Sequence, residues 1–327
     1  MGRVVVVTGA SAGVGRATVR KLAERGDRIG LIARSEKQLK ATADEVRRLG
    51  GTALVLPLDV ADPQAVDDAA ARVESELGEI DVWVNDHMTS VLARTWEIAP
   101  ADYRRVMEVN YLGYVHGTQA ALRRMLPRDR GVIVQVGSAL AYRGIPLQSP
   151  YCATKFAIRG FTDSLRCELM AEGSNVRLTM VQLPGLNTPQ FTWVRTTLRR
   201  RPKPVPPIFQ PEIAAEGIVW AMDHPRRELW VGLMTAIVIA GNAVAPRLAD
   251  RYLAKTNIQA QQDDTPIDPS RPDYLYEPID EDRGAHGPYD GEAKQHGVQL
   301  ALAQHRRAIG VATAAGVAVG ALAGRSR

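Results

Sequence analysis

The stretch Arg3-Val4-Val5-Val6-Val7-Thr8-Gly9-Ala10-Ser11-Ala12-Gly13-Val14-Gly15-Arg16 is the part of the sequence that indicates the fold most clearly. Its β-branched run is typical of a buried parallel strand, and a helical pattern of apolar residues follows the glycines. Glycine between a strand and a helix lets the backbone approach a ligand closely, and the N–H groups at a helix start favour an anion. The stretch therefore predicts a turn that binds a diphosphate, and the alternative is a plain tight turn.

Strands and helices alternate through most of the chain. The sequence predicts strands at 3–7, 28–33, 53–58, 80–84, 132–136, 176–181 and 229–231, and helices at 14–25, 36–49, 62–77, 100–126, 151–171, 189–200 and 211–222. This order favours an α/β fold, a Rossmann-type doubly wound parallel sheet with helices on both faces. Ligands of such sheets bind at the carboxyl ends of the strands.

Length and charge predict an extension after the sheet. The 327 residues exceed one sheet domain of about 250 residues. Residues 259–300 hold ten acidic and three basic residues and five prolines, so this segment has a net charge of −7 within a chain of +5. We expect a sheet domain at 1–258, an acidic, proline-rich strap or linker at 259–300 that lies against the basic body, and an Ala/Gly-rich helix at 301–327.

A tyrosine and a lysine share a face of one predicted helix. Tyr151 and Lys155 are four residues apart, about one helical turn, and Ser138 lies upstream at the end of a predicted strand. The pKa of a tyrosine is about 10, and an adjacent fixed cation lowers it. With a serine to hold a carbonyl or alcohol oxygen, the three side chains could move a proton to or from that oxygen. The alternative is an ordinary surface tyrosine and lysine.

Taken together, the motifs resemble those of the short-chain dehydrogenase/reductase family over roughly residues 3 to 230. The matching pieces are the glycine turn at 8–15, Asp59-Val60, Asn110, Ser138, and Tyr151 with Lys155. The resemblance implies a nicotinamide-dependent oxidoreductase whose catalytic domain is 1–258. Tyr151 would be the acid-base group, Ser138 would hold the substrate oxygen, Lys155 would bind the ribose and activate the phenol, and Asn110 would position a relay water.

The resemblance also implies a set of cofactor-binding residues and no metal site. The set is Thr8, Gly9, Ser11, Ala12, Gly13, Val14, Gly15, Arg34, Asp59, Val60, Asn85, Tyr151, Lys155, Pro184, Gly185 and Thr188. NADP is expected rather than NAD, because Ala33 stands where an acidic residue would accept from the ribose and Arg34 stands where a base would bind a 2′-phosphate. The alternative is that Arg34 is a solvated loop residue.

Two segments depart from the family pattern. Asn85-Asp86-His87-Met88 replaces the usual Asn-Asn-Ala-Gly, so bulky side chains and an unusual carboxyl are expected near the cofactor. His87 could serve in acid-base chemistry, and the alternative is a histidine that only packs or faces water. Thr188 comes one residue earlier than in the family.

The expected function is an NADP-dependent oxidoreductase that interconverts a small-molecule carbonyl and a secondary alcohol. The alternative is a non-catalytic nucleotide-sensing or membrane-associated scaffold on the same fold. We expect a cytoplasmic protein, because no signal peptide precedes the first strand and the two cysteines, Cys152 and Cys167, lie too far apart on one helix to bridge. The family resemblance implies a homo-oligomer, and no motif supports nucleic-acid binding. Residues 308–324 are uncharged, and Ala312, Gly316, Gly320 and Gly324 follow one another at every fourth position, which leaves open membrane contact, a soluble interaction helix or a frayed tail.

Overall fold

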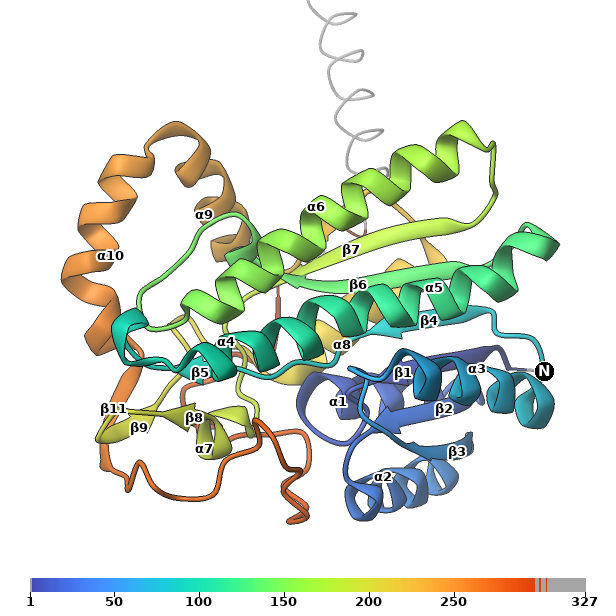
Figure 1. The fold of residues 1–327 in the computed structure, drawn as a ribbon, viewed down its shortest axis with the longest axis horizontal. Helices are drawn as coiled ribbons and strands as arrows, with labels where there is room; N and C mark the ends of the chain where they lie inside the picture. Colours follow the sequence, from blue (N-terminus) through green and yellow to red (C-terminus); the bar gives the residue numbers. More distant parts are fainter. Residues whose placement is uncertain (1, 298–299, 301–303, 305–327) are drawn as a thin grey trace, which may run out of the picture.

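The computed structural model describes residues 2–297, 300 and 304, and its centre is a seven-stranded parallel sheet (Figure 1). The strand order is β10-β7-β6-β4-β1-β2-β3. The strands are β1 (Val4–Thr8), β2 (Arg28–Ala33), β3 (Thr52–Pro57), β4 (Val82–Asn85), β6 (Val132–Ser138), β7 (Arg177–Leu183) and β10 (Glu228–Trp230). The order reverses between β1 and β4, so the fold is doubly wound, and a ligand crevice is expected at that switch point. The predicted fold class is confirmed.

Helices cover both faces of the sheet. They are α1 (Gly13–Ala23), α2 (Glu36–Arg48), α3 (Pro63–Leu77), α4 (Pro100–Val106), α5 (Gly113–Met125), α6 (Ser149–Ala171) and α8 (Pro211–Asp223). One apolar core joins α1, α2 and α8 to the sheet, and a second joins α3, α5 and α6 to the other face. The start of α3 follows the sequence signal, because the Asp62 carboxylate accepts from the N–H groups of Gln64 and Ala65.

Two predicted helices differ from the structure. Residues 189–200 form only the short α7 (Gln190–Trp193), after which the chain becomes the strands β8 (Arg195–Thr196) and β9 (Arg200–Pro202). The strand β8 pairs with β5 (Val91–Leu92), a contact between distant segments that local periodicity does not encode. The helix expected at 100–126 is interrupted by a π-helical turn at Met107–Leu112.

Two further helices follow the sheet. The apolar segment after β10 is helix α9 (Leu233–Val244), and α10 (Pro246–Ala260) follows it directly. Both lie at one end of the molecule, on the left of Figure 1. Among the described residues, no helix has the length and the apolar character needed to cross a membrane. The segment at 308–324, for which membrane contact was one expectation, lies outside the described residues.

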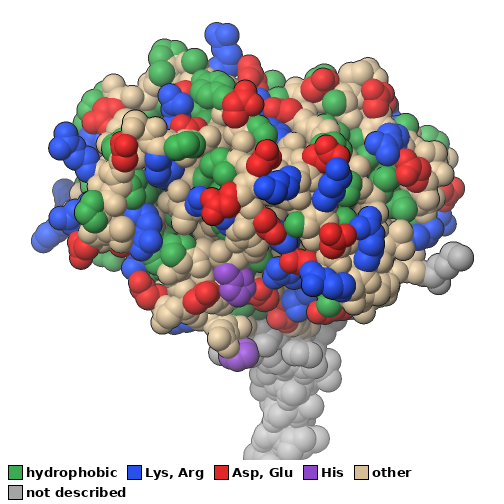
Figure 2. Space-filling model, turned by 90° about the horizontal axis from the view of Figure 1, so that it is seen from below, with side chains coloured by type: hydrophobic (Ala, Val, Ile, Leu, Met, Phe, Trp, Pro, Cys, Tyr) green, Lys and Arg blue, Asp and Glu red, His purple; other side chains and the backbone are tan. Residues whose placement is uncertain are grey.

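The acidic segment lies against basic residues of the body. It begins as β11 (Gln262–Pro266), antiparallel to β9, and we call residues 262–297 the strap. Its carboxylates form ion pairs with cations of the body, including Arg201–Asp263 at 2.6 Å, Arg195–Asp273 at 3.3 Å and Lys203–Glu292 at 2.7 Å. Figure 2 shows acidic and basic side chains alternating across the face of the molecule seen from below. The acidic segment therefore contacts the basic part of the chain, as its opposite charge predicted.

Candidate active site

A cavity of about 1010 Å³ opens at the carboxyl ends of the sheet strands. Loops after β1, β2, β4, β6 and β7 form its walls, and α9, α10 and the strap add to them. Most residues of the predicted set line this cavity: Gly9, Ser11, Ala12, Gly13, Val14, Gly15, Arg34, Asp59, Val60, Ser138, Tyr151, Lys155, Pro184, Gly185 and Thr188. Thr8, Asn85 and Asn110 are buried behind the wall instead. The fold thus brings the glycine turn and the tyrosine–lysine pair to one cavity.

The glycine turn has the shape that a diphosphate site requires. Gly9 and Gly13 adopt φ values of +73° and +56°, in the left-handed region where a side chain is strained. A Cβ on Gly15 would lie 2.2 Å from the Gly9 carbonyl oxygen, so only glycine allows α1 to begin this close to β1. No side chain caps the start of α1, although the Gly13 N–H donates to Gly284 O of the strap at 3.2 Å. The remaining N–H groups of the first helical turn can face an anion.

Thr8 and His87 support the glycine turn from beneath. The Thr8 hydroxyl accepts from the Asp86 N–H at 3.0 Å and lies 2.7 Å from His87 Nδ1. His87 Nε2 donates to the Val109 carbonyl at 3.0 Å, because a carbonyl can only accept. Burial and the nearby Lys155 charge lower the pKa of His87 to about 3. His87 is therefore a neutral packing residue, as the second interpretation of the sequence held.

Asn85 and Asn110 hold elements together rather than line the cavity. Asn85 Oδ1 accepts from Trp83 Nε1 at 2.9 Å and Asn85 Nδ2 donates to Gln135 Oε1 at 2.9 Å, which uses the amide inside the core. Asn110 lies in the π-helical turn, where its Oδ1 accepts from the Thr89 N–H at 2.7 Å and its Nδ2 donates to the Thr89 carbonyl at 2.8 Å. Asn110 thereby fixes the loop after β4.

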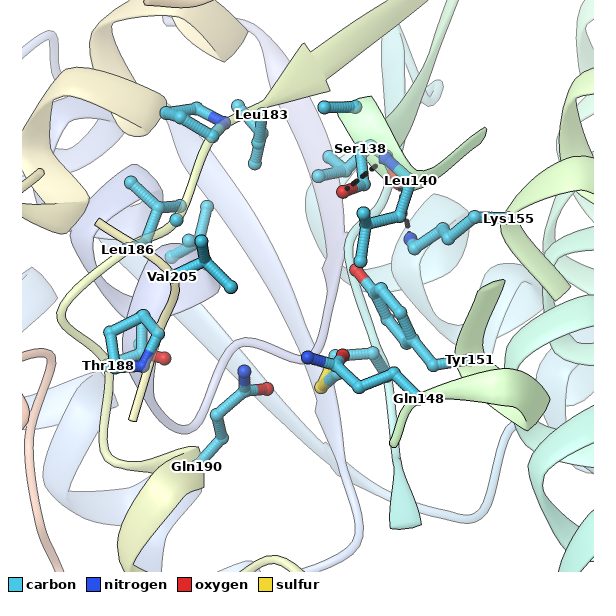
Figure 3. A pocket seen from close by; sticks show the side chains of 18 of the residues that line it. Ser138, Leu140, Gln148, Tyr151, Lys155, Leu183, Leu186, Thr188, Gln190 and Val205 are labelled. Atoms are coloured by element: carbon cyan, nitrogen blue, oxygen red, sulfur yellow. Dashed lines mark hydrogen bonds between the residues drawn. The ribbon is translucent and has the colours of Figure 1, made fainter. Parts of the chain in front are cut away.

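Ser138, Tyr151 and Lys155 stand together on one side of the cavity, opposite Leu186 and Val205 (Figure 3). Lys155 Nζ donates to the Val136 carbonyl at 2.8 Å and lies 5.5 Å from the centre of the Tyr151 ring. Burial raises the pKa of Tyr151 above its ordinary value, and a hydrogen bond with Ser138 opposes that change. The predicted lowering of the phenol pKa relied on the ammonium together with a positively charged nicotinamide ring, so it stays a prediction for the complex. The cost of burial, which depends on the fold, outweighs the distant ammonium.

Asp86 is a carboxyl on the cavity wall without a cation in direct contact among the described residues. Burial raises the pKa of Asp86 to about 8, and the charge of Lys155 opposes this rise. Burial likewise lowers the pKa of Lys155 to about 8, and Asp86 opposes that change. The two groups therefore titrate in the same pH range and influence each other. Asp86 was recognised in the sequence only as an unusual charge, because its link to Lys155 is made in three dimensions.

Arg34 lies on the cavity wall and is held by the strap. Its guanidinium donates to the main-chain carbonyls of Tyr274, Leu275 and Tyr276, the last at 2.7 Å. Burial lowers the pKa of Arg34. None of the described carboxylates forms an ion pair with Arg34, so its charge is fixed in place but not neutralised. Neighbouring Ser35 donates to Asp280 of the strap at 2.8 Å.

The strap therefore supplies part of the cavity wall, which the sequence motifs did not indicate. Tyr274, Pro278 and Ile279 of the strap line the cavity beside Arg34. The strap joins this site across about 240 positions of the chain, and no local pattern signals such a contact.

Comparisons with known proteins agree with this geometry. The family model for short chain dehydrogenase matches residues 3–198. A relative from Bacillus subtilis (strain 168), Uncharacterized oxidoreductase YxnA, is 33% identical over 277 residues, 84% of this chain and 78% of that protein. A metagenomic short-chain oxidoreductase solved with NADP has a TM-score of 0.58 and 26% identity, covering 70% of this chain and 96% of that one. The alcohol dehydrogenase of Thermococcus sibiricus, complexed with 5-hydroxy-NADP, shares the fold at a TM-score of 0.60 and 24% identity, covering 71% and 96%.

Proposed function

This chain belongs to the short-chain dehydrogenase/reductase family, and from that premise we propose that it is an NADP-dependent oxidoreductase interconverting a carbonyl and a secondary alcohol. The observation that carries the proposal is the placement of Ser138, Tyr151 and Lys155 on the wall of the cavity that also contains the glycine turn. We also infer that residues 1–258 form the catalytic unit and that the strap completes its cofactor wall.

The residues present fit a nicotinamide dinucleotide. The strained backbone at Gly9 and Gly13 and the close packing at Gly15 leave room for phosphates where any side chain would intrude. When bound, the nicotinamide supplies or accepts the hydride. The Tyr151 hydroxyl, a phenol that is protonated at neutral pH, would donate a proton to the carbonyl oxygen during reduction. Ser138 holds the same oxygen, and Lys155 binds the ribose beside Tyr151.

The function is tested by incubating the protein with NADPH and a panel of ketones and aldehydes while cofactor absorbance is recorded. Consumption of NADPH that requires both a carbonyl compound and Tyr151 supports the proposal. Binding of NADPH without turnover across the panel would favour the alternative, a nucleotide-sensing protein.

Arg34→Gln is expected to reverse the cofactor preference. The Arg34 side chain lines the cavity without a carboxylate partner among the described residues, and the N–H donors that it does not use on the strap carbonyls can bind a phosphate. The NADP-bound relative at 26% identity supports the same cofactor. Loss of a charge-assisted contact costs about 2 kcal/mol, so the affinity for NADPH should fall roughly 30-fold while that for NADH changes little.

Titration calorimetry with both cofactors measures this change. Arg199→Gln serves as the control, since Arg199 is an exposed arginine that does not line the cavity. Equal losses for NADH and NADPH in Arg34→Gln would mean that Arg34 only anchors the strap.

Asp86→Asn is expected to shift the pH dependence of dinucleotide binding. Lys155 binds as an ammonium, so affinity should weaken as pH rises through about 8, the pKa to which burial lowers this group. The Asp86 carboxylate opposes that lowering, and its removal should move the midpoint to lower pH. Fluorescence titrations with NADPH between acidic and basic pH measure the midpoint, with Asp264→Asn, an exposed strap carboxylate, as the control. An unchanged midpoint would show that the Asp86 carboxylate does not influence the pKa of Lys155.

A further inference from the structure

Helix α9 is apolar along almost its whole length and yet is barely covered. Its sequence is LMTAIVIAGNAV, and among its residues only Thr235 and Ile239 are buried. Large apolar side chains of α9 and α10 face solvent instead: Leu233, Met234, Ile237, Val244, Leu248 and Tyr252, with exposures from 38% for Met234 to 86% for Val244. We call these six the hairpin patch. Single exposed apolar residues are ordinary, but a group on two adjoining helices marks a binding surface.

A basic stripe accompanies the hairpin patch. Arg247, Arg251 and Lys255 follow one another at every fourth position of α10, so they lie along one side of the helix. All three are exposed, and none of the ion pairs among the described residues includes them. The one acidic residue of α10, Asp250, is paired with Arg143. The stripe therefore presents three cations that no described carboxylate neutralises.

The patch continues into the cavity. Met234, Ile237, Leu248 and Tyr252 line the same cavity as Tyr151, whereas Leu233 and Val244 do not. The apolar surface of the hairpin therefore forms part of the wall of the cavity that contains the tyrosine.

We propose that the α9–α10 hairpin binds the surface of an anionic lipid bilayer, so that an apolar carbonyl or alcohol dissolved in the lipid enters the cavity directly. Apolar side chains beside Arg and Lys on a helix are the combination that inserts at a charged lipid interface. A second copy of the chain is a poorer occupant, because a two-fold contact would bring two sets of uncompensated cations together. The part of the proposal that concerns the substrate rests on the proposed function, and the part that concerns the bilayer does not.

Binding to a bilayer is tested by sedimentation of the full chain with phosphatidylcholine vesicles, with and without phosphatidylglycerol. We expect binding that requires the anionic lipid and weakens as salt is raised. The triple variant Arg247→Gln/Arg251→Gln/Lys255→Gln should bind roughly 100-fold more weakly, since each cation near such a surface contributes about 1 kcal/mol. Leu233→Ser/Val244→Ser should weaken binding as well.

Two matched variants control for charge and for apolar surface elsewhere. Lys37→Gln/Lys40→Gln/Arg48→Gln removes three exposed cations from α2, and Leu126→Ser/Met170→Ser removes two exposed apolar side chains, so both should bind as the unchanged chain does. The proposal is overturned if the full chain ignores anionic vesicles, or if the α10 triple variant binds them undiminished. It is equally overturned if the hairpin variants convert a dimer into a monomer, because the patch would then cover a second copy.

Entry of the substrate from the lipid is tested by comparing the rate on a long-chain ketone carried in anionic vesicles with the rate on a short water-soluble ketone. The α10 triple variant should lose roughly 10-fold or more in rate on the vesicle-borne ketone and keep its rate on the soluble one. Equal rates on both ketones would overturn lipid-side entry. If the unchanged chain reduced neither ketone, the oxidoreductase function would be refuted, whereas the vesicle-binding result would be unaffected.

Discussion

Tyr151→Phe is expected to lower kcat for carbonyl reduction about 1000-fold, within the range that a positioned acid-base group contributes. The phenyl ring fills the same space on the cavity wall, so the fold and the dinucleotide affinity should be retained. Only the hydroxyl is lost, and with it the hydrogen bond to Ser138 and the proton that the carbonyl oxygen would receive. Lys155 keeps its bond to the Val136 carbonyl and cannot replace the phenol.

Single-turnover absorbance of bound NADPH measures this loss separately from product release. Tyr142→Phe is the matched control, because Tyr142 is a nearby tyrosine whose hydroxyl donates to Glu228 at 2.6 Å and which does not line the cavity. Its turnover should remain within about 3-fold of the unchanged chain. If Tyr151→Phe kept more than a tenth of the activity, another group would have to be the acid.

Gly15→Ala is expected to abolish tight dinucleotide binding and to destabilise the fold. The added Cβ would lie 2.2 Å from the Gly9 carbonyl oxygen and 2.7 Å from the Gly9 carbonyl carbon. Both are main-chain atoms, so the clash is relieved only if the turn opens or α1 moves away from β1. Overpacking of this kind costs about 1–3 kcal/mol, and the displaced N–H groups should weaken NADPH binding by roughly 100-fold.

Urea unfolding and calorimetric titration measure the two effects. Gly160→Ala is the matched control: Gly160 is an exposed residue of α6 with no atom within 4 Å of an added Cβ. Alanine should stabilise that helix by about 1 kcal/mol and leave binding unchanged. If Gly15→Ala kept full affinity for NADPH, binding of the phosphates would not depend on the turn.

The parts of the fold that were predictable are those written in local patterns. The run Val4–Val7 and the glycines after it specify a strand, a turn and a helix within one short segment, and the same periodicity recurs along the sheet. The strands β5 and β8 were missed because each is two residues long and exists only through its pairing with the other. The division of the chain into domains and the roles of the site residues stay predictions.

The site was less predictable because its chemistry depends on distant contacts and on burial. Asn85 was assigned to the cofactor, but the surrounding core engages its side chain. Lys155 together with a charged nicotinamide ring was expected to lower the pKa of Tyr151, whereas burial raises it. The link between Arg34 and Tyr276 crosses 242 positions, and residue spacing cannot reveal it.

The cofactor wall is complete only after the strap has folded against the sheet domain. Arg16, at the start of α1, is almost fully buried between Glu45 and Asp282, and that last residue lies 266 positions further along the chain. Because translation runs from the amino to the carboxyl end, the glycine turn leaves the ribosome long before the strap, and α1 lacks this contact until the strap has been made. Contact between Arg16 and Asp282 closes a long loop, which costs conformational entropy. Contacts between such distant positions form slowly during folding. The glycine turn is therefore made well before the segment that completes its surroundings.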